Sequence, residues 1–103
     1  MPFGLPGHTV QGIRSVFRAH PEVERVILYG SRAKGKYTAG SDIDLACRGR
    51  DLTRSDLNRI HHELDELLLP YYIDLSLPET ISNRELLDHI ARVGVTFYQR
   101  EHE

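Results

Sequence analysis

The sequence predicts an α/β fold (α+β in stricter usage), a small mixed β-sheet with helices packed on one face. Apolar residues recur at helical spacing in three segments, and short apolar runs of strand length lie between them. Two of these runs are sorted by parity, with apolar side chains on one face of the sheet and Asp on the other: Asp42 and Asp44 beside the first run, and Asp74 in the second. A length of 103 residues suits a single domain, 1–103, with one modest core.

The N-terminal half is predicted to form a helix and then a central strand. Pro21 limits the helix to about residue 19 or 20, because the residue before proline avoids helical geometry. The helix has an apolar stripe of Val10, Ile13, Val16 and Phe17. The strand covers about residues 25–29, where consecutive apolar residues are typical of a strand covered on both faces.

The rest of the chain is predicted to add two strands, two helices and a short edge strand. Strands are expected over about residues 43–48 and 71–77, and the edge strand over 95–98. Residues 53–56 resemble a capping box that opens a helix to about residue 69. Its buried stripe is Leu57, Ile60, Leu64, Leu67 and Leu68. A second capping box, Ser82 to Glu85, opens the last helix, which Gly94 caps.

Composition excludes several classes of protein. Lys and Arg total 13 against 15 Asp and Glu, so the charge is near neutral and direct nucleic-acid binding is not expected. The single cysteine, Cys47, excludes an internal disulfide and fits a reducing cytoplasm. No apolar run reaches membrane-spanning length, and the N-terminus does not have the pattern of a signal peptide. We expect a cytoplasmic protein that does not bind membranes.

One motif points to chemistry. Gly30 and Ser31 follow the central strand, and ten residues separate them from Asp42 and Asp44. Carboxylates two apart on a strand share a face, and a turn with Gly and Ser can offer N–H and hydroxyl groups to phosphates. This combination is what metal-assisted phosphoryl or nucleotidyl transfer needs. Asp-x-Asp alone is expected roughly 0.5 times by chance in this chain, but a Gly-Ser pair at a fixed offset lowers this to about 0.002.

Further residues are weaker candidates. Arg32, with Lys34 and Lys36, brings positive charge to where a triphosphate would lie, although solvated loop charges are the alternative. Asp74 interrupts the apolar run of the third predicted strand, where Asp is disfavoured, so a functional role is preferred over a plain solvent-facing position. The six histidines lack a shared ligand spacing, so no zinc site is expected.

The string from Gly30-Ser31 to Asp42-Ile43-Asp44 resembles the signature of the DNA polymerase beta-like nucleotidyltransferase superfamily. In a chain this short, GSRAKG and SDIDL resemble its minimal nucleotidyltransferase (MNT) branch. The resemblance implies an enzyme that transfers AMP from ATP. It also implies that Asp42, Asp44 and Asp74 are the catalytic carboxylates and hold Mg²⁺, two ions in number, with Mn²⁺ as a possible substitute. The nucleotide-binding residues that it implies are Gly30 and Ser31, with Arg32 and Ser41 as weaker candidates.

The acceptor is a separate question, because nothing after the core is long enough for a substrate-binding domain. This weakens an aminoglycoside or tRNA acceptor. The resemblance to MNT proteins implies instead a helical HEPN-type toxin as the partner that is AMP-modified, with this chain as the antitoxin. Two alternatives stay open: a non-catalytic regulatory module that binds a helical partner, and a small-molecule nucleotidyltransferase whose acceptor site a homo-oligomer completes. The intact set of three Asp favours an enzyme over the binding module.

Overall fold

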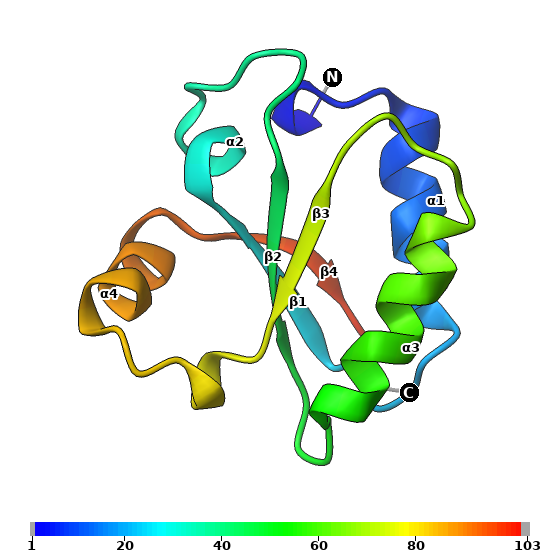
Figure 1. Cartoon of the computed structure of the whole chain (residues 1–103), viewed down its shortest axis with the longest axis vertical. Coiled ribbons are helices and arrows are strands. Elements are labelled where there is room, and N and C mark those ends of the chain that lie inside the picture. Colours follow the sequence, from blue (N-terminus) through cyan, green and yellow to red (C-terminus); the bar gives the residue numbers. More distant parts are fainter. Residues whose placement is uncertain (1, 102–103) are drawn as a thin grey trace.

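A computed structural model describes residues 2–101 and contains a four-stranded mixed sheet (Figure 1). The strand order is β3-β2-β1-β4. β1 pairs antiparallel with β2 and β4, whereas β2 and β3 are parallel. The strands are β1 (Arg25–Tyr29), β2 (Ile43–Arg48), β3 (Ile73–Ser76) and β4 (Val95–Gln99). The mixed α+β fold and the edge strand near the C-terminus are confirmed.

The larger core lies between the sheet and two helices, α1 (Gly7–Arg18) and α3 (Arg54–Asp65). α3 supplies the crossover that a parallel β2–β3 pair requires. The predicted capping box at its start is confirmed, because the Thr53 hydroxyl accepts from the Asp56 N–H and the Asp56 carboxylate accepts from the Thr53 N–H. The two helices and the sheet bury large apolar side chains completely or almost so, among them Ile13, Phe17, Leu45, Ile60 and Leu64.

The prediction that the helices pack on one face is wrong for α4 (Arg84–Val93), which packs on the opposite face of the sheet. Figure 1 shows α4 and the short α2 (Gly30–Lys34) on the side of the sheet away from α1 and α3. A second, smaller core forms there from Ile27, Tyr29, Ala46 and Ile90. The physical reason is that β1 is apolar at consecutive positions, so its second face also needs cover.

Several predicted boundaries are also corrected. α3 ends at Asp65, and Leu67 and Leu68 are 36% and 88% exposed, so they do not belong to the buried stripe. Leu68, two residues before Pro70, has a φ of 55°, a left-handed conformation that a continuing α-helix does not contain. α4 is capped by Asn83, whose side-chain oxygen accepts from the Leu86 N–H, and not by Ser82.

The third strand begins later than predicted, at Ile73. Its parallel partner β2 begins at Ile43, which pairs with Ile73, so residues 71 and 72 have no strand residue opposite them. Within residues 2–101, none of the helices combines the length and apolar character that crossing a membrane requires.

Candidate functional site

The Gly-Ser turn and the Asp pair meet because β1 and β2 are antiparallel. Tyr29, the last residue of β1, pairs with Asp44 of β2, and Gly30 begins α2 directly after Tyr29. Gly30 has a φ of 76°, a left-handed conformation that favours glycine. A Cβ on Gly30 would also collide with the Oδ2 atom of Asp44. The left-handed backbone favours glycine at this position, and the missing side chain lets the turn lie directly against the carboxylate of Asp44.

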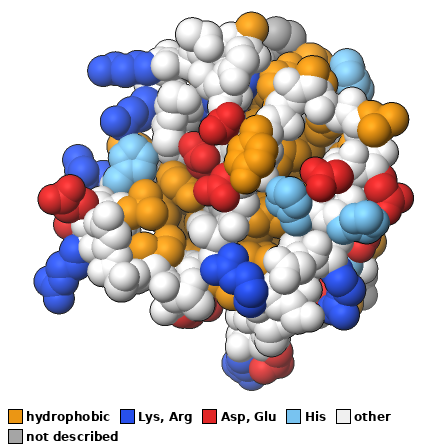
Figure 2. Space-filling view, in the orientation of Figure 1, with side chains coloured by type: hydrophobic (Ala, Val, Ile, Leu, Met, Phe, Trp, Pro, Cys, Tyr) orange, Lys and Arg blue, Asp and Glu red, His pale blue; other side chains and the backbone are white. Residues whose placement is uncertain are grey.

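Asp44 and Asp74 are direct partners across the parallel β2–β3 pair, so both carboxylates lie on the same face of the sheet. Asp42 is exposed just before β2 begins. The pKa of Asp44 is raised, first by its burial and then by the negative charges of Asp74 and Asp42. Figure 2 shows acidic side chains gathered above β2 and β3, near α2. The structure thus brings Asp42 and Asp74 within electrostatic reach of Asp44.

The chemistry of the three predicted ligands suits a hard cation, but in this structure the ligands are not yet spaced to hold one. All the predicted ligands are carboxylate oxygens, which Mg²⁺ prefers. Among residues 2–101, however, no group of three His, Cys, Asp or Glu side chains is already spaced to hold a metal ion. Burial first, and then the repulsion from Asp74 and Asp42, raises the pKa of Asp44, and a bound cation would offset both effects.

Arg32 is committed to the fold. It is only 2% exposed, and its guanidinium donates to the Phe3 carbonyl at 2.9 Å and twice to the Ser41 carbonyl, at 3.0 and 3.1 Å. The same group lies over the rings of Tyr37 and Tyr71. Arg32 therefore holds the loop that leads back into β2. Its guanidinium donates to backbone carbonyl oxygens.

The two serines differ in their availability. The Ser41 hydroxyl accepts from the Thr38 N–H at 2.8 Å, so it closes a turn within the loop. Ser31, the second residue of α2, is half-buried, and its hydroxyl has no hydrogen-bond partner within residues 2–101. Of these two, Ser31 has the hydroxyl that is free to meet a ligand.

His89 of α4 lies at the site, and sequence analysis did not select it. Its Nε2 atom accepts a hydrogen bond from the Gly30 N–H at 3.1 Å. Its ring also meets the ring of Tyr29 edge-on, with centroids 6.1 Å apart. The available signal was its position three residues after Leu86 and four before Val93, on the inward stripe of the helix. Because all helices were expected on the sheet face opposite to the carboxylates, this inward stripe was not associated with the site.

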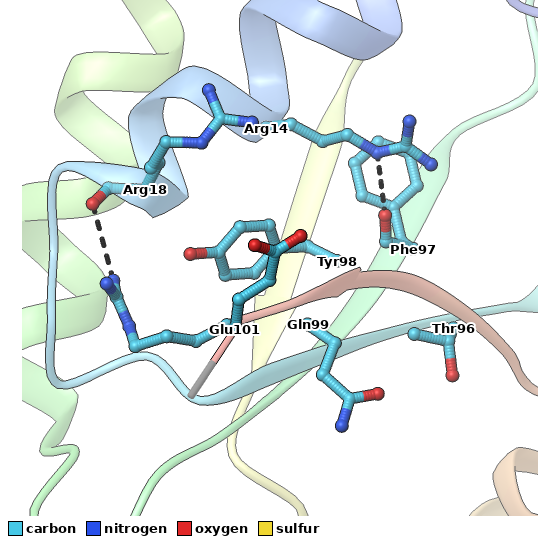
Figure 3. A pocket seen from close by; sticks show the side chains of 8 residues that line it. Arg14, Arg18, Thr96, Phe97, Tyr98, Gln99 and Glu101 are labelled. Atoms are coloured by element: carbon cyan, nitrogen blue, oxygen red, sulfur yellow. Dashed lines mark hydrogen bonds between the residues drawn. The ribbon is translucent and has the colours of Figure 1, made fainter. Parts of the chain in front are cut away.

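A separate hollow of about 550 Å³ lies between α1 and β4 (Figure 3). Its lining includes three arginines, Arg14, Arg18 and Arg100. Arg14 donates to the Phe97 carbonyl, and Arg100 donates to the Arg18 carbonyl. Gln99, which also lines it, pairs with Arg25 at the start of β1, whereas Asp44 pairs with Tyr29 at its end. The hollow is therefore at the other end of the sheet from the carboxylates.

Solved structures with a similar fold come from toxin–antitoxin complexes. One, crystallised with AMP-PNP, has a TM-score of 0.70 at 21% identity and covers 89% of this chain and 74% of the other. Another, a tri-AMPylated HEPN toxin from Shewanella oneidensis in complex with an MNT antitoxin, has a TM-score of 0.65 at 19% identity, with 90% and 71% covered. At these identities the likeness concerns the fold.

Two sequence comparisons concern a relative of this chain and the protein family whose model it matches. The DNA mismatch repair protein MutL of Bacillus anthracis is 40% identical over 50 residues, which are 48% of this chain and only 8% of MutL. This chain therefore spans a small part of that relative. The model of the family described as "Polymerase beta, Nucleotidyltransferase" matches residues 11–103, which include the whole Gly-Ser to Asp-x-Asp motif and Asp74. The chain belongs to the polymerase beta-like nucleotidyltransferase family and has the fold of the MNT antitoxins.

Proposed function

We propose that this nucleotidyltransferase transfers AMP from ATP to a hydroxyl group of a partner protein, in a Mg²⁺-dependent reaction, and acts as the antitoxin of a HEPN/MNT pair. The observation that carries the proposal is the register of the sheet. It sets Asp44 beside Asp74 and directly against the Gly30 turn. Carboxylates and a turn that can offer N–H and hydroxyl groups are the two halves of a site for a metal-bound nucleotide.

Asp42, Asp44 and Asp74 would hold the ions, with two Mg²⁺ expected and Mn²⁺ as a substitute. When bound, such ions neutralise the charge of a triphosphate and favour ionisation of an attacking hydroxyl. Gly30 and Ser31 would contact the β- and γ-phosphates, because the Ser31 hydroxyl has no partner among the described residues and Gly30 has no side chain to keep a phosphate away. We leave Arg32 and Ser41 out of the direct contacts, since both are occupied in holding the loop.

The reaction forms one bond and breaks another. The oxygen of the acceptor hydroxyl attacks the α-phosphorus of ATP, and the bond from that phosphorus to the bridging oxygen breaks. AMP becomes attached to the acceptor, and pyrophosphate leaves with the bond's electron pair. We assign the proton of the hydroxyl to Asp74, which shares the face of Asp44 and is half-buried.

The partner is proposed from the similar proteins. Their structures contain a HEPN toxin with an MNT antitoxin, and in one of them the toxin is tri-AMPylated. By analogy, the acceptor here is a hydroxyl on a helical HEPN protein in the cytoplasm, and the chain forms a stable complex with it.

The test is a labelling experiment with a HEPN protein encoded beside this chain in its host. ATP labelled at the α-phosphate is supplied with Mg²⁺, and label on the HEPN protein is measured for wild type, Asp44→Asn and Asp51→Asn. We expect wild type and the exposed control Asp51→Asn to label the partner, and Asp44→Asn or chelation to abolish most of the label. A complex that forms on gel filtration without any labelling would instead identify a binding module. Equal labelling by Asp44→Asn would contradict the assigned site.

A further inference from the structure

The hydrogen bond between Gly30 and His89 joins two elements that are 59 residues apart in the chain. The donor is the N–H of Gly30, so the acceptor nitrogen Nε2 carries no proton, and the proton of the neutral ring is on Nδ1. Gly30 is the first residue of α2, and the first N–H groups of a helix have no partner within it. His89 supplies the partner that this amide lacks.

The helix that carries His89 is lightly held. Ile90 is the one fully buried residue of α4, and Leu86 and Val93 are partly buried against the small core on this face. The His89 ring is half-buried and rests edge-on against Tyr29. Loss of one hydrogen bond would therefore let the ring withdraw without opening the larger core on the other face of the sheet.

We propose that His89 is a positioning residue, which holds the Gly30–Ser31 turn in the nucleotide-free protein and is replaced there by a phosphate oxygen when ATP binds. This inference rests on the proposed function, in which the same turn receives the triphosphate. One N–H cannot give a full-strength hydrogen bond to two acceptors, so the phosphate and His89 compete for it. α4 then shifts with nucleotide occupancy, since it carries the displaced ring.

Three variants distinguish the role of His89 as a hydrogen-bond acceptor from the packing of its ring against Tyr29. His89→Phe keeps a flat ring beside Tyr29 and removes the acceptor. His89→Gln keeps an acceptor, because its Oε1 reaches about as far as the Nε2 of histidine. His62→Phe is the matched control, because His62 is 78% exposed on α3 and distant in the fold from α4.

The first measurement needs no nucleotide. Amide hydrogen exchange of Gly30 is followed by NMR in the wild type and the three variants. Loss of the hydrogen bond should speed this exchange about threefold to tenfold in His89→Phe, while His89→Gln and His62→Phe stay close to wild type. Equal exchange in wild type and His89→Phe would overturn the role of His89 in holding the turn.

The second measurement is the dissociation constant for a non-hydrolysable ATP analogue, the β,γ-imido compound, with Mg²⁺. His89→Phe should bind it about threefold to tenfold more tightly than wild type, because no acceptor has to be displaced, and His89→Gln should restore the wild-type value. In wild type, the His89 ring signals should move when the analogue is added. Equal or weaker binding by His89→Phe overturns the displacement. Absence of binding by all four proteins overturns the proposed function itself, and the Gly30 exchange then decides the role of His89 alone.

Discussion

The repulsion between Asp44 and Asp74 gives a prediction about stability that separates a metal site from unrelated surface acids. The two residues are register partners on neighbouring strands, which lie about 4.8 Å apart, so their charges are about 5 Å apart. At that distance two unit charges repel by about 3 kcal/mol at an effective dielectric of 20 and by about 0.8 kcal/mol in water. Both side chains are half-buried, so we take about 1 kcal/mol as the repulsion.

Asp74→Asn removes this repulsion and keeps the shape of the side chain. We expect its melting temperature to rise by about 4 to 8 °C in EDTA at neutral pH, as about 1 kcal/mol does for a domain of this size. Asp51→Asn, an exposed carboxylate beyond the far end of β2, should not shift. Thermal unfolding followed by circular dichroism measures both. A mutant that melts at or below the wild-type temperature would show that the two carboxylates do not oppose each other.

The rise in melting temperature of Asp74→Asn should also depend on pH. The folded-state pKa of Asp44 is raised, so protonated Asp44 favours the folded state, and that stability is lost as the pH rises through the raised pKa. The advantage of Asp74→Asn should therefore be complete above the raised pKa and fade as the pH falls to the ordinary value of about 3.9. Mg²⁺ and the ATP analogue should raise the melting temperature of Asp74→Asn less than that of wild type, because the mutant has lost a metal ligand. Equal stabilisation of both proteins would remove Asp74 from the site.

Local signals were sufficient for much of the fold. β1 and β2 have the predicted bounds, because a run of consecutive apolar residues marks β1 and the alternation of Ile43, Asp44 and Leu45 marks the start of β2. The start of α3 was equally local, since Thr53 and Asp56 cap the helix through contacts three residues apart. Gly30 meets Asp44 because β1 and β2 are consecutive strands that pair antiparallel, with only the short α2 and a loop between them. These features need no knowledge of distant packing.

The rest depended on tertiary contacts. The periodicity of α4 shows which of its residues face inward, but not which face of the sheet they meet, and so His89 was not associated with Gly30. Arg32 was predicted from its charge to lie near a phosphate. Its geometry instead follows from the carbonyl groups of residues 3 and 41, which the loop and the N-terminal segment bring to it. The chemistry of a side chain can be read from the sequence, whereas the groups that it contacts depend on the tertiary structure.

Two predictions concern the residues that shape the turn. Arg32→Lys keeps the charge but loses the fork that reaches the Phe3 and Ser41 carbonyls, so we expect a loss of about 2 to 3 kcal/mol in the free energy of unfolding by urea, while exposed Arg48→Lys loses none. An equal effect at both positions would argue against a structural Arg32. Gly30→Ala and Gly35→Ala provide the sharper comparison, because both glycines have a φ of 76°. Alanine in this conformation costs about 1 to 2 kcal/mol at either site. Only at Gly30 does the added methyl group meet another residue, the carboxylate of Asp44, whereas a Cβ at Gly35 has nothing within 4 Å. Gly30→Ala should therefore lose at least about 1 kcal/mol more than Gly35→Ala, and adding Asp44→Ser should recover most of that difference. Equal losses in the two single variants, measured by the same urea unfolding, would mean that the turn and Asp44 are not in contact.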